Sequence, residues 1–303
     1  MGVCASSTTE ESRQKKQNNQ IDKEQMAEVV RQKQSVKLLL LGPGESGKST
    51  MLKQMRLLKL SSFTEKELEE YRPTIYMNIW TSILEILHGM RLLEINFQDP
   101  SLESQAQILF TSASPEVERQ RPDPKFRAIV KNLWKDPAVK KCLERRAEFQ
   151  LNDSAKYFLD DIDRICDDNF IPSEHDVLKV RATTTGVVEI IFNYKSLIFR
   201  VIDVGGQKSE RRKWIHQFES VDCVVFVAAI SEYDQTMRED ETTNRMADSL
   251  LLFSNIVNGP YFNTTAIILF LNKTDLFREK IAHQPLTVAF PNYPGKYLLW
   301  SSF

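Results

Sequence analysis

Short apolar runs alternate with longer amphipathic stretches along this chain, and the two patterns predict different elements. The runs are rich in Val, Ile, Leu and Phe, which favour β-strands, and they span residues 36–41, 187–194, 197–203, 223–229 and 266–271. Between the first two runs, residues 63–176 place apolar side chains at helical spacing, as at Tyr71, Ile75 and Ile79, which predicts helices. We therefore expect an α/β fold with an all-helical insertion.

Weaker signals complete this pattern. Residues 49–60 predict a helix directly after the first strand, and residues 193–196 suit a hairpin turn. Helical stretches near 207–218 and 240–257 separate the later strands. Residues 7–34 are polar with a weak apolar stripe, which predicts an exposed helix that either docks on a partner or forms a solvated arm.

The composition excludes several classes of protein. A chain of 303 residues with 42% hydrophobic residues can bury a large core, and its length suggests about two domains. The 40 basic and 41 acidic side chains nearly cancel, so no net charge favours nucleic acid as a partner. No apolar run approaches the length that crosses a bilayer. The four cysteines show neither disulfide-framework nor zinc spacing, and we expect a reducing compartment.

The first six residues carry a signal for membrane attachment. Met1-Gly2-Val3-Cys4-Ala5-Ser6 fits the pattern for myristoylation of Gly2, and the thiol of Cys4 offers a site for a second acyl chain. One myristoyl chain binds membranes only marginally, whereas two chains hold stably, so the pair predicts a peripheral lipid anchor. The alternative is a chance match in a polar tail.

The clearest chemical motif lies between the first predicted strand and the helix that follows it. The segment Gly42-Pro43-Gly44-Glu45-Ser46-Gly47-Lys48-Ser49 matches the phosphate-binding loop G-x-x-x-x-G-K-[ST]. Its glycines allow backbone N–H groups to face phosphates at a helix N-terminus, Lys48 adds positive charge, and the Ser49 hydroxyl can ligate Mg²⁺. Pro43 has no N–H and adds no donor. The motif predicts a nucleoside triphosphate site without choosing the base.

The base is indicated by a second motif at the end of the last apolar run. Asn272-Lys273-Thr274-Asp275 has the form N-K-x-D, at the carboxyl end of a strand, where open α/β sheets bind ligands. The Asp275 carboxylate can accept hydrogen bonds from both N1–H and the exocyclic amine of guanine, whereas adenine offers no such pair. A buried polar match of this kind discriminates strongly, so we expect GTP rather than ATP.

Two further segments suit a triphosphate that is hydrolysed. The first is Asp203-Val204-Gly205-Gly206-Gln207, at the end of an apolar strand. Its acid suits the shell of ligands around a metal ion, and the glycine that follows offers an N–H to the γ phosphate. Gln207 is then placed to orient water. Upstream, Arg181 precedes a threonine run and could neutralise the charge that develops on the transferred phosphoryl group. An ordinary glycine-rich turn and a solvated surface arginine are the alternatives.

Together these motifs resemble those of the α subunits of heterotrimeric G proteins, over residues 1 to about 295. Residues 42–50 resemble the family's G-x-G-E-S-G-K-S-T loop, and residues 203–207 with 209–214 look like its second switch. Residues 270–273 resemble its base-recognition strand, and residues 151–154 are similar to the nucleotide-facing segment of its insertion. The resemblance implies a Ras-like P-loop GTPase domain that carries an inserted all-helical domain.

The resemblance also implies roles for individual residues. Arg181 becomes the intrinsic arginine finger and Gln207 the residue that positions the attacking water. Ser49 and Thr184 become Mg²⁺ ligands, and Asp203 holds a metal-bound water. Glu45 becomes a latch to Arg181 or part of a water network. The implied contacts to GTP or GDP are Glu45, Ser46, Gly47, Lys48, Ser49, Thr50, Asp153, Ser154, Leu178, Lys179, Val180, Arg181, Ala182, Thr183, Thr184, Asp203, Val204, Gly205, Gly206, Gln207, Asn272, Lys273, Thr274 and Asp275.

The family's organisation supplies boundaries and partners. It implies a lipidated N-terminal helix over 1–34, a GTPase domain over 35–60 and 181–303, and a helical domain over 61–180. The N-terminal helix and second switch are expected to bind a βγ dimer, and a G protein-coupled receptor is the expected upstream partner. The expected location is the cytoplasmic face of the plasma membrane, whereas the sequence identifies no effector.

Three departures from the family pattern affect these expectations. Pro43 stands where the family most often has a small residue, and Lys208 replaces the usual arginine, losing a planar bidentate donor. From Lys296 to Phe303 the sequence matches nothing in the family, whose last helices, final strand, guanine-contacting T-C-A-T loop and receptor-binding tail have no counterpart here. We therefore expect strand 266–271 to form an open apolar edge and the chain to have low stability, or to fold only with a partner.

Three functions remain open at this point. The first is a GTPase switch, and the second is a binding module that holds nucleotide weakly and sequesters βγ at the membrane. The third is a P-loop ATPase or kinase, which the residues Asn272 to Asp275 disfavour.

Overall fold

The computed structural model describes residues 34–240 and 242–294. The predictions for the helix over 7–33, for lipidation of Gly2 and Cys4, and for the divergent segment from Lys296 to Phe303 lie outside the described residues. Among the helices of the described ranges, none combines the length and the apolar character needed to span a bilayer.

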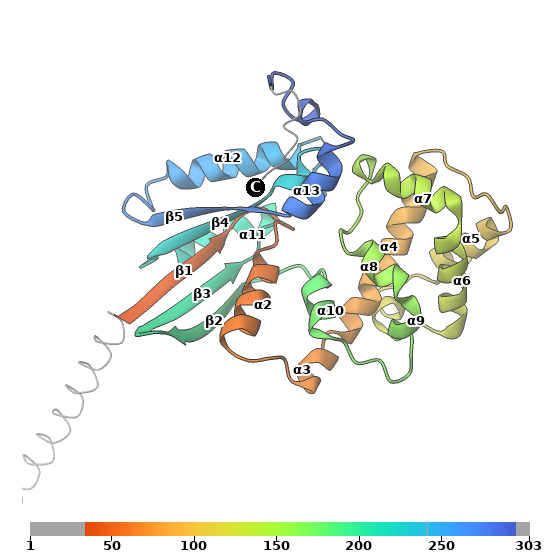
Figure 1. The fold of residues 1–303 in the computed structure, drawn as a ribbon, viewed down its shortest axis with the longest axis horizontal. Helices are drawn as coiled ribbons and strands as arrows, with labels where there is room; N and C mark the ends of the chain where they lie inside the picture. The colour runs from red at the N-terminus through yellow and green to blue at the C-terminus, as the bar shows by residue number, and fades with distance from the viewer. Residues whose placement is uncertain (1–33, 241, 295–303) are drawn as a thin grey trace, which may run out of the picture.

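One part of the molecule is a five-stranded sheet (Figure 1). Along the sheet, the strands are β2 (Val187–Tyr194), β3 (Leu197–Val204), β1 (Ser35–Leu41), β4 (Cys223–Ala229) and β5 (Ala266–Asn272). Neighbouring strands are parallel, except that β2 and β3 form an antiparallel hairpin. The carboxyl ends of the four parallel strands therefore meet at one edge, and the predicted α/β fold is confirmed.

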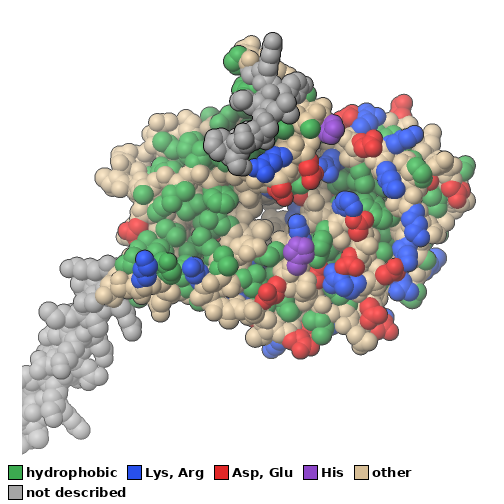
Figure 2. All heavy atoms as spheres, viewed as in Figure 1, with side chains coloured by type: hydrophobic (Ala, Val, Ile, Leu, Met, Phe, Trp, Pro, Cys, Tyr) green, Lys and Arg blue, Asp and Glu red, His purple; other side chains and the backbone are tan. Residues whose placement is uncertain are grey.

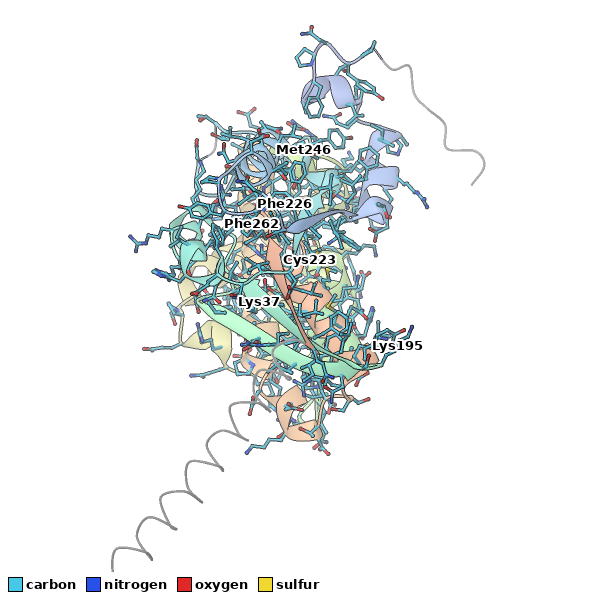
Figure 3. The ribbon with its side chains drawn as sticks, turned by 90° about the vertical axis from the view of Figure 1, so that its left-hand side faces the viewer. Lys37, Lys195, Cys223, Phe226, Met246 and Phe262 are labelled. Carbon is cyan, nitrogen blue, oxygen red and sulfur yellow. The ribbon has the colours of Figure 1, made fainter. Side chains whose placement is uncertain are left out.

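The alternation of side chains along the central strands builds two separate cores. Leu39 and Leu41 face the cluster under helix α12 (Arg245–Val257), whereas Leu40 faces the cluster under helix α2 (Lys48–Lys59). Figure 3 shows Phe226 and Phe262 of the α12 cluster close together, and Lys195 far from them at the turn between β2 and β3. Because both faces of β4 are covered, all seven of its residues are buried, as the apolar runs of parallel sheets require.

The other part of the molecule is the helical insertion between α2 and β2 (Figure 1). Its α-helices are α3 (Glu65–Glu69), α4 (Arg72–Leu92), α5 (Leu102–Ser112), α6 (Pro124–Lys135), α7 (Pro137–Glu144), α8 (Ala155–Asp160), α9 (Ile162–Ile165) and α10 (Glu174–Lys179). Short 3₁₀ turns at Val117–Arg119 and Arg146–Glu148 lie between them. The predicted stripe on α4 is confirmed, because Ile75, Ile79 and Ile83 have no exposed surface and pack at the centre of this part.

Two helix predictions were wrong in their boundaries. The stretch 240–257 is helical only from Arg245, because the Asn244 side chain accepts hydrogen bonds from the N–H groups of Met246 and Ala247 and so caps α12. The stretch 207–218 divides into α11 (Lys208–Arg211) and a 3₁₀ turn, Trp214–Gln217.

Strand β5 differs from β4 although both are apolar. It lies at the edge of the sheet, and within the described residues it pairs only with β4. About half of the surface of Ile268 (52%) and Leu271 (53%) is exposed, and Leu251 of α12 is 64% exposed. Hydrophobic side chains accordingly gather on the surface of the sheet part in Figure 2.

Candidate functional site

The phosphate-loop motif forms the turn between β1 and α2. Gly42 and Gly47 have positive φ angles of 142° and 102°, which residues with a Cβ rarely adopt. A Cβ at Gly42 would lie 2.3 Å from the Val227 carbonyl oxygen, and one at Gly47 would lie 2.1 Å from Nδ2 of Asn272. Since α2 begins at Lys48, its first N–H groups, which lack intrahelical acceptors, border this turn. The turn therefore has the shape and polarity of an anion site.

The side chain of Lys48 lies inside this turn. It is buried, and its Nζ donates to the carbonyls of Gly42 at 3.0 Å and Pro43 at 2.8 Å. Burial lowers the pKa of Lys48 to about 8, although attraction to Asp203 opposes the change. Pro43, which lacks an N–H, thus takes part in the loop through its carbonyl.

Three side-chain oxygens converge beside Lys48. The Ser49 hydroxyl lies 2.6 Å from that of Thr184 and donates to Oδ2 of Asp203 at 2.5 Å. Burial raises the pKa of Asp203, and its Oδ1 is buried without a hydrogen-bond partner. Two hydroxyls and a carboxylate with an unpaired oxygen form a hard donor set, which fits Mg²⁺. The three residues predicted as metal ligands therefore lie together.

Glu45 joins the loop to a group of arginines. Its carboxylate accepts from Arg181 at 2.5 Å and from Arg245 at 3.1 Å, and Nε of Arg238 lies 3.1 Å away. Burial alone would raise the pKa of Glu45, but attraction from Arg181, Arg245 and Arg238 outweighs it, and the pKa is lowered. The carboxylate is therefore held charged, in the position of the latch to Arg181.

The segment from Gly205 to Gln207 lies against the same loop. A Cβ on Gly206 would lie 2.5 Å from the Pro43 carbonyl oxygen and 2.6 Å from that of Gly42, so no larger residue fits there. The Gly206 carbonyl accepts from Nε of Arg211, and the Gly205 carbonyl accepts from the indole N–H of Trp214 at 2.7 Å. Both carbonyls are thereby tied to α11 and the 3₁₀ turn after it.

The N-K-x-D segment follows β5 directly. Nδ2 of Asn272 donates to the Ser46 carbonyl at 2.8 Å, which ties this segment to the phosphate loop. Nζ of Lys273 lies 2.7 Å from a carboxylate oxygen of Asp153 in the helical insertion and 2.6 Å from one of Glu232. Burial alone would lower the pKa of Lys273, but these two carboxylates outweigh it, and the pKa is raised. The segment therefore connects the sheet to the insertion.

These segments share one cleft of about 690 Å³ between the sheet and the helical insertion, and Figure 2 shows the surface hollowed there. Lys48 and Asp275, more than two hundred residues apart, both lie on its wall. The predicted contact residues all line this cleft except Ser46, Val204, Gly205 and Thr274. The cleft also continues along α2 to Lys53, whose pKa burial lowers to about 8.

Several residues that contact the lining of the cleft were missed by the motifs. Arg238, Arg245 and Glu232 follow β4 and surround Glu45 or Lys273. Asn78 and Glu85 belong to α4 and face the same region. Arg238 and Glu85 are ordinary charged residues in the sequence, whereas Asn78 is a polar residue on the apolar stripe of α4, a signal that could have identified it.

The sequence of this chain is similar to those of known proteins over most of its length. Residues 15–298 match the family model described as "G-protein alpha subunit". The chain is 47% identical over 296 residues to the "Guanine nucleotide-binding protein alpha-7 subunit" of Caenorhabditis elegans, covering 98% of this chain and 83% of that protein. It is 46% identical over 291 residues to the "Guanine nucleotide-binding protein G(o) subunit alpha" of Planorbella trivolvis, covering 96% and 82%. The similarity thus extends over both the sheet and the helical insertion.

Proposed function

The chain belongs to the G-protein alpha subunit family, and on this premise we propose that it is a signalling switch that binds GTP and hydrolyses it to GDP and phosphate. The observation that carries the proposal is the single cleft lined by both Lys48 and Asp275. The proposed GTPase domain comprises residues 35–60 and 181–303, and the proposed helical domain comprises residues 61–180.

In this proposal the two ends of the cleft bind different parts of the nucleotide. The N-terminal N–H groups of α2 and the Lys48 ammonium bind the β and γ phosphates. Asp275 accepts hydrogen bonds from N1–H and the exocyclic amine of guanine, which excludes adenine. Asn272 supports both ends, because its side chain bonds to the Ser46 carbonyl of the phosphate loop.

Ser49, Thr184 and Asp203 would hold Mg²⁺, Asp203 through a bound water. Bound there, the ion would supply positive charge against the phosphate oxygens. The buried, unpartnered Oδ1 of Asp203 and the two neighbouring hydroxyls support this assignment.

The proposed reaction is attack of water on the γ phosphorus of GTP. A bond forms between phosphorus and the water oxygen while the bond from phosphorus to the β–γ bridging oxygen breaks. GDP leaves with the bridging oxygen. One proton of the attacking water stays on its oxygen, and the other passes to another oxygen of the released phosphate. Gln207 orients the water, and the Arg181 guanidinium neutralises charge on the transferred group. Glu45 holds that guanidinium beside the phosphate loop.

The proposed partners follow from the family. We propose a βγ dimer and a G protein-coupled receptor as partners, and attachment to the cytoplasmic face of the plasma membrane through acyl chains on Gly2 and Cys4. The near-zero net charge supports the expectation that nucleic acid is not a partner.

Single-turnover phosphate release from GTP tests the activity. Arg181→Cys and Gln207→Leu should each slow release roughly 100-fold or more, because the first removes the charge beside the transferred phosphoryl group and the second removes the group that orients the attacking water. Arg119→Cys, at an exposed arginine in a 3₁₀ turn of the insertion, is the matched control and should keep the wild-type rate. Equal rates in all four proteins would contradict the proposal.

Competition between nucleotides tests the choice of base. Unlabelled GTP should displace labelled GTP that is bound to the protein, whereas ATP at the same concentration should not. Equal displacement by ATP would overturn the assignment of Asp275.

A further inference from the structure

Asn78 is a polar residue on the most apolar surface of α4. It lies between Ile75 and Ile79, which have no exposed surface, and it is itself only 4% exposed. A buried carboxamide costs free energy unless its donors and acceptors are paired. An apolar side chain would suit the packing of α4 better, so the reason for a carboxamide has to lie in its hydrogen bonds.

Both principal hydrogen bonds of Asn78 go to the backbone of one residue, Arg181. Oδ1 of Asn78 accepts from the Arg181 N–H at 2.7 Å, and Nδ2 donates to the Arg181 carbonyl at 2.8 Å. Residues 181–185 lie in neither a helix nor a strand, so regular secondary structure gives this backbone no partners. Asn78 therefore fixes Arg181 where local structure does not.

The side chain of Arg181 is fixed separately, by the bond of its guanidinium to Glu45 in the phosphate loop. Arg181 is thus held at its backbone by the helical insertion and at its side chain by the phosphate loop between β1 and α2.

A second set of contacts closes this arrangement into a ring. Nη1 of Arg238 donates to Glu85 of α4 at 2.5 Å, and Nε of Arg238 lies 3.1 Å from Glu45. Glu85 also accepts from the backbone N–H of Asn152, whose side chain reaches Asn78 at 3.4 Å. Two routes therefore connect Asn78 to Glu45, one through Arg181 and one through Asn152, Glu85 and Arg238.

We propose that Asn78 is a positioning residue for Arg181, through which the helical insertion sets the reach of the guanidinium toward the transferred phosphoryl group. The inference rests on the proposed GTPase function. Asn78 acts on the rate of hydrolysis through Arg181 and has no contact with substrate of its own.

The test is a double-mutant cycle measured by single-turnover phosphate release. Asn78→Leu keeps the number and branching of the side-chain heavy atoms and suits the apolar stripe, but it removes both hydrogen bonds. It should slow hydrolysis roughly 10- to 100-fold, the loss expected when a reacting group is misplaced by about 1 Å. The affinity for GTP, measured by equilibrium binding, should change less than about 3-fold, because Asn78 only positions Arg181. In an Arg181→Ala background the same substitution should have no further effect on the rate.

Two variants make the cycle decisive. Asn78→Asp keeps an acceptor for the Arg181 N–H and loses the donor, so its rate of hydrolysis should fall between those of the wild type and Asn78→Leu. If Asn78→Leu does not fold, Asn78→Asp replaces it in the double-mutant cycle. Asn132→Leu is the matched control, because Asn132 is in the same insertion but its side chain bonds to Gln105 away from the cleft. It should keep the wild-type rate.

The outcomes separate this inference from the function on which it rests. Slowing by Asn78→Leu that is equal in the wild type and in Arg181→Ala, or no slowing in the wild type, overturns the role of Asn78 alone. A wild type that is no faster than Arg181→Ala overturns the proposed role of Arg181, and the positioning role falls with it.

Discussion

In the helical insertion the apolar side of the long helix α4 is covered along its length, whereas in the sheet the apolar strand β5 is covered only in part. Ile75, Ile79 and Ile83 of α4 have no exposed surface. Strand β4 is equally buried, yet Ile268 of β5, its direct neighbour in the sheet, is half exposed. Apolar composition therefore identifies a segment that forms a strand, but its position in the sheet decides how much of it is covered.

Removing a large side chain from the closed core should have the largest effect on stability. Phe158 of α8 has no exposed surface and belongs to the core around α4. Phe158→Ala should lower the free energy of unfolding by about 4 kcal/mol, through lost burial and the cavity that remains. Urea denaturation followed by circular dichroism measures this loss. Leu92→Ala, at a 66% exposed position, should cost under about 0.5 kcal/mol, and equal costs would contradict a closed core.

A buried carboxylate in the insertion should give a smaller effect that depends on pH. Asp176 is fully buried, accepts from Arg164 at 2.9 and 2.8 Å, and caps α10 together with Ser173. Burial alone would raise the pKa of Asp176, but the hydrogen bonds from Arg164, Ser173 and Tyr157 outweigh it, and the pKa is lowered. Asp176→Asn should therefore cost about 2 kcal/mol at pH 7.

The sign of the pH effect follows from the lowered pKa. A carboxyl group whose pKa is lower in the folded state stabilises the fold above its unfolded pKa of about 4, and this stabilisation is lost as the pH falls through the folded value. The difference between wild type and Asp176→Asn should be constant above about pH 5 and shrink below about pH 4. A difference that grows in acid would contradict the cited interactions.

Matched substitutions in β4 and β5 compare a buried strand with a partly exposed one and should give the smallest changes in stability. Val225 and Ile268 are direct partners in the sheet, with 4% and 52% of their surface exposed. Val225→Thr buries an unpaired hydroxyl and should cost about 2 kcal/mol, whereas Ile268→Thr should cost about 0.5 kcal/mol or less. Denaturant unfolding of both variants decides this, and equal costs would mean that β5 is covered in solution.

The strands could be predicted because each apolar run is short, is preceded by a polar or glycine residue and nearly coincides with an observed strand. The start of α12 was placed too early, although Thr242, Thr243 and Asn244 are weak helix formers and asparagine favours the N-cap position. In the structure Thr236 and Asn244 form a bridge before the helix, and the Asn244 side chain caps it. A cap of this kind competes with the helical pattern, and the pattern alone does not show which prevails.

The residues of the candidate site also fall into those that the sequence could predict and those that it could not. Lys48 and Asp275 belong to local motifs whose spacing reflects a turn at the end of a strand, and the structure brings both to one cleft. Arg238 and Glu85 belong to no motif, because they meet only when α4 of the insertion packs beside the loop after β4. Asn78 stands out as a polar residue on the apolar stripe of α4, but the sequence does not show that its partner is Arg181. Contacts that depend on the packing of distant segments leave no local pattern in the sequence.

The hydrogen bond from the Trp214 indole N–H to the Gly205 carbonyl makes this tryptophan an intrinsic fluorescence probe. The ring is 3% exposed and attached to the backbone beside Gln207, so a rearrangement of that backbone changes the polarity around the indole and hence its emission. Replacing the other three tryptophans, Trp80, Trp134 and Trp300, with phenylalanine would leave one emitter. Its spectrum would follow the segment from Gly205 to Gln207 in real time, without any attached dye.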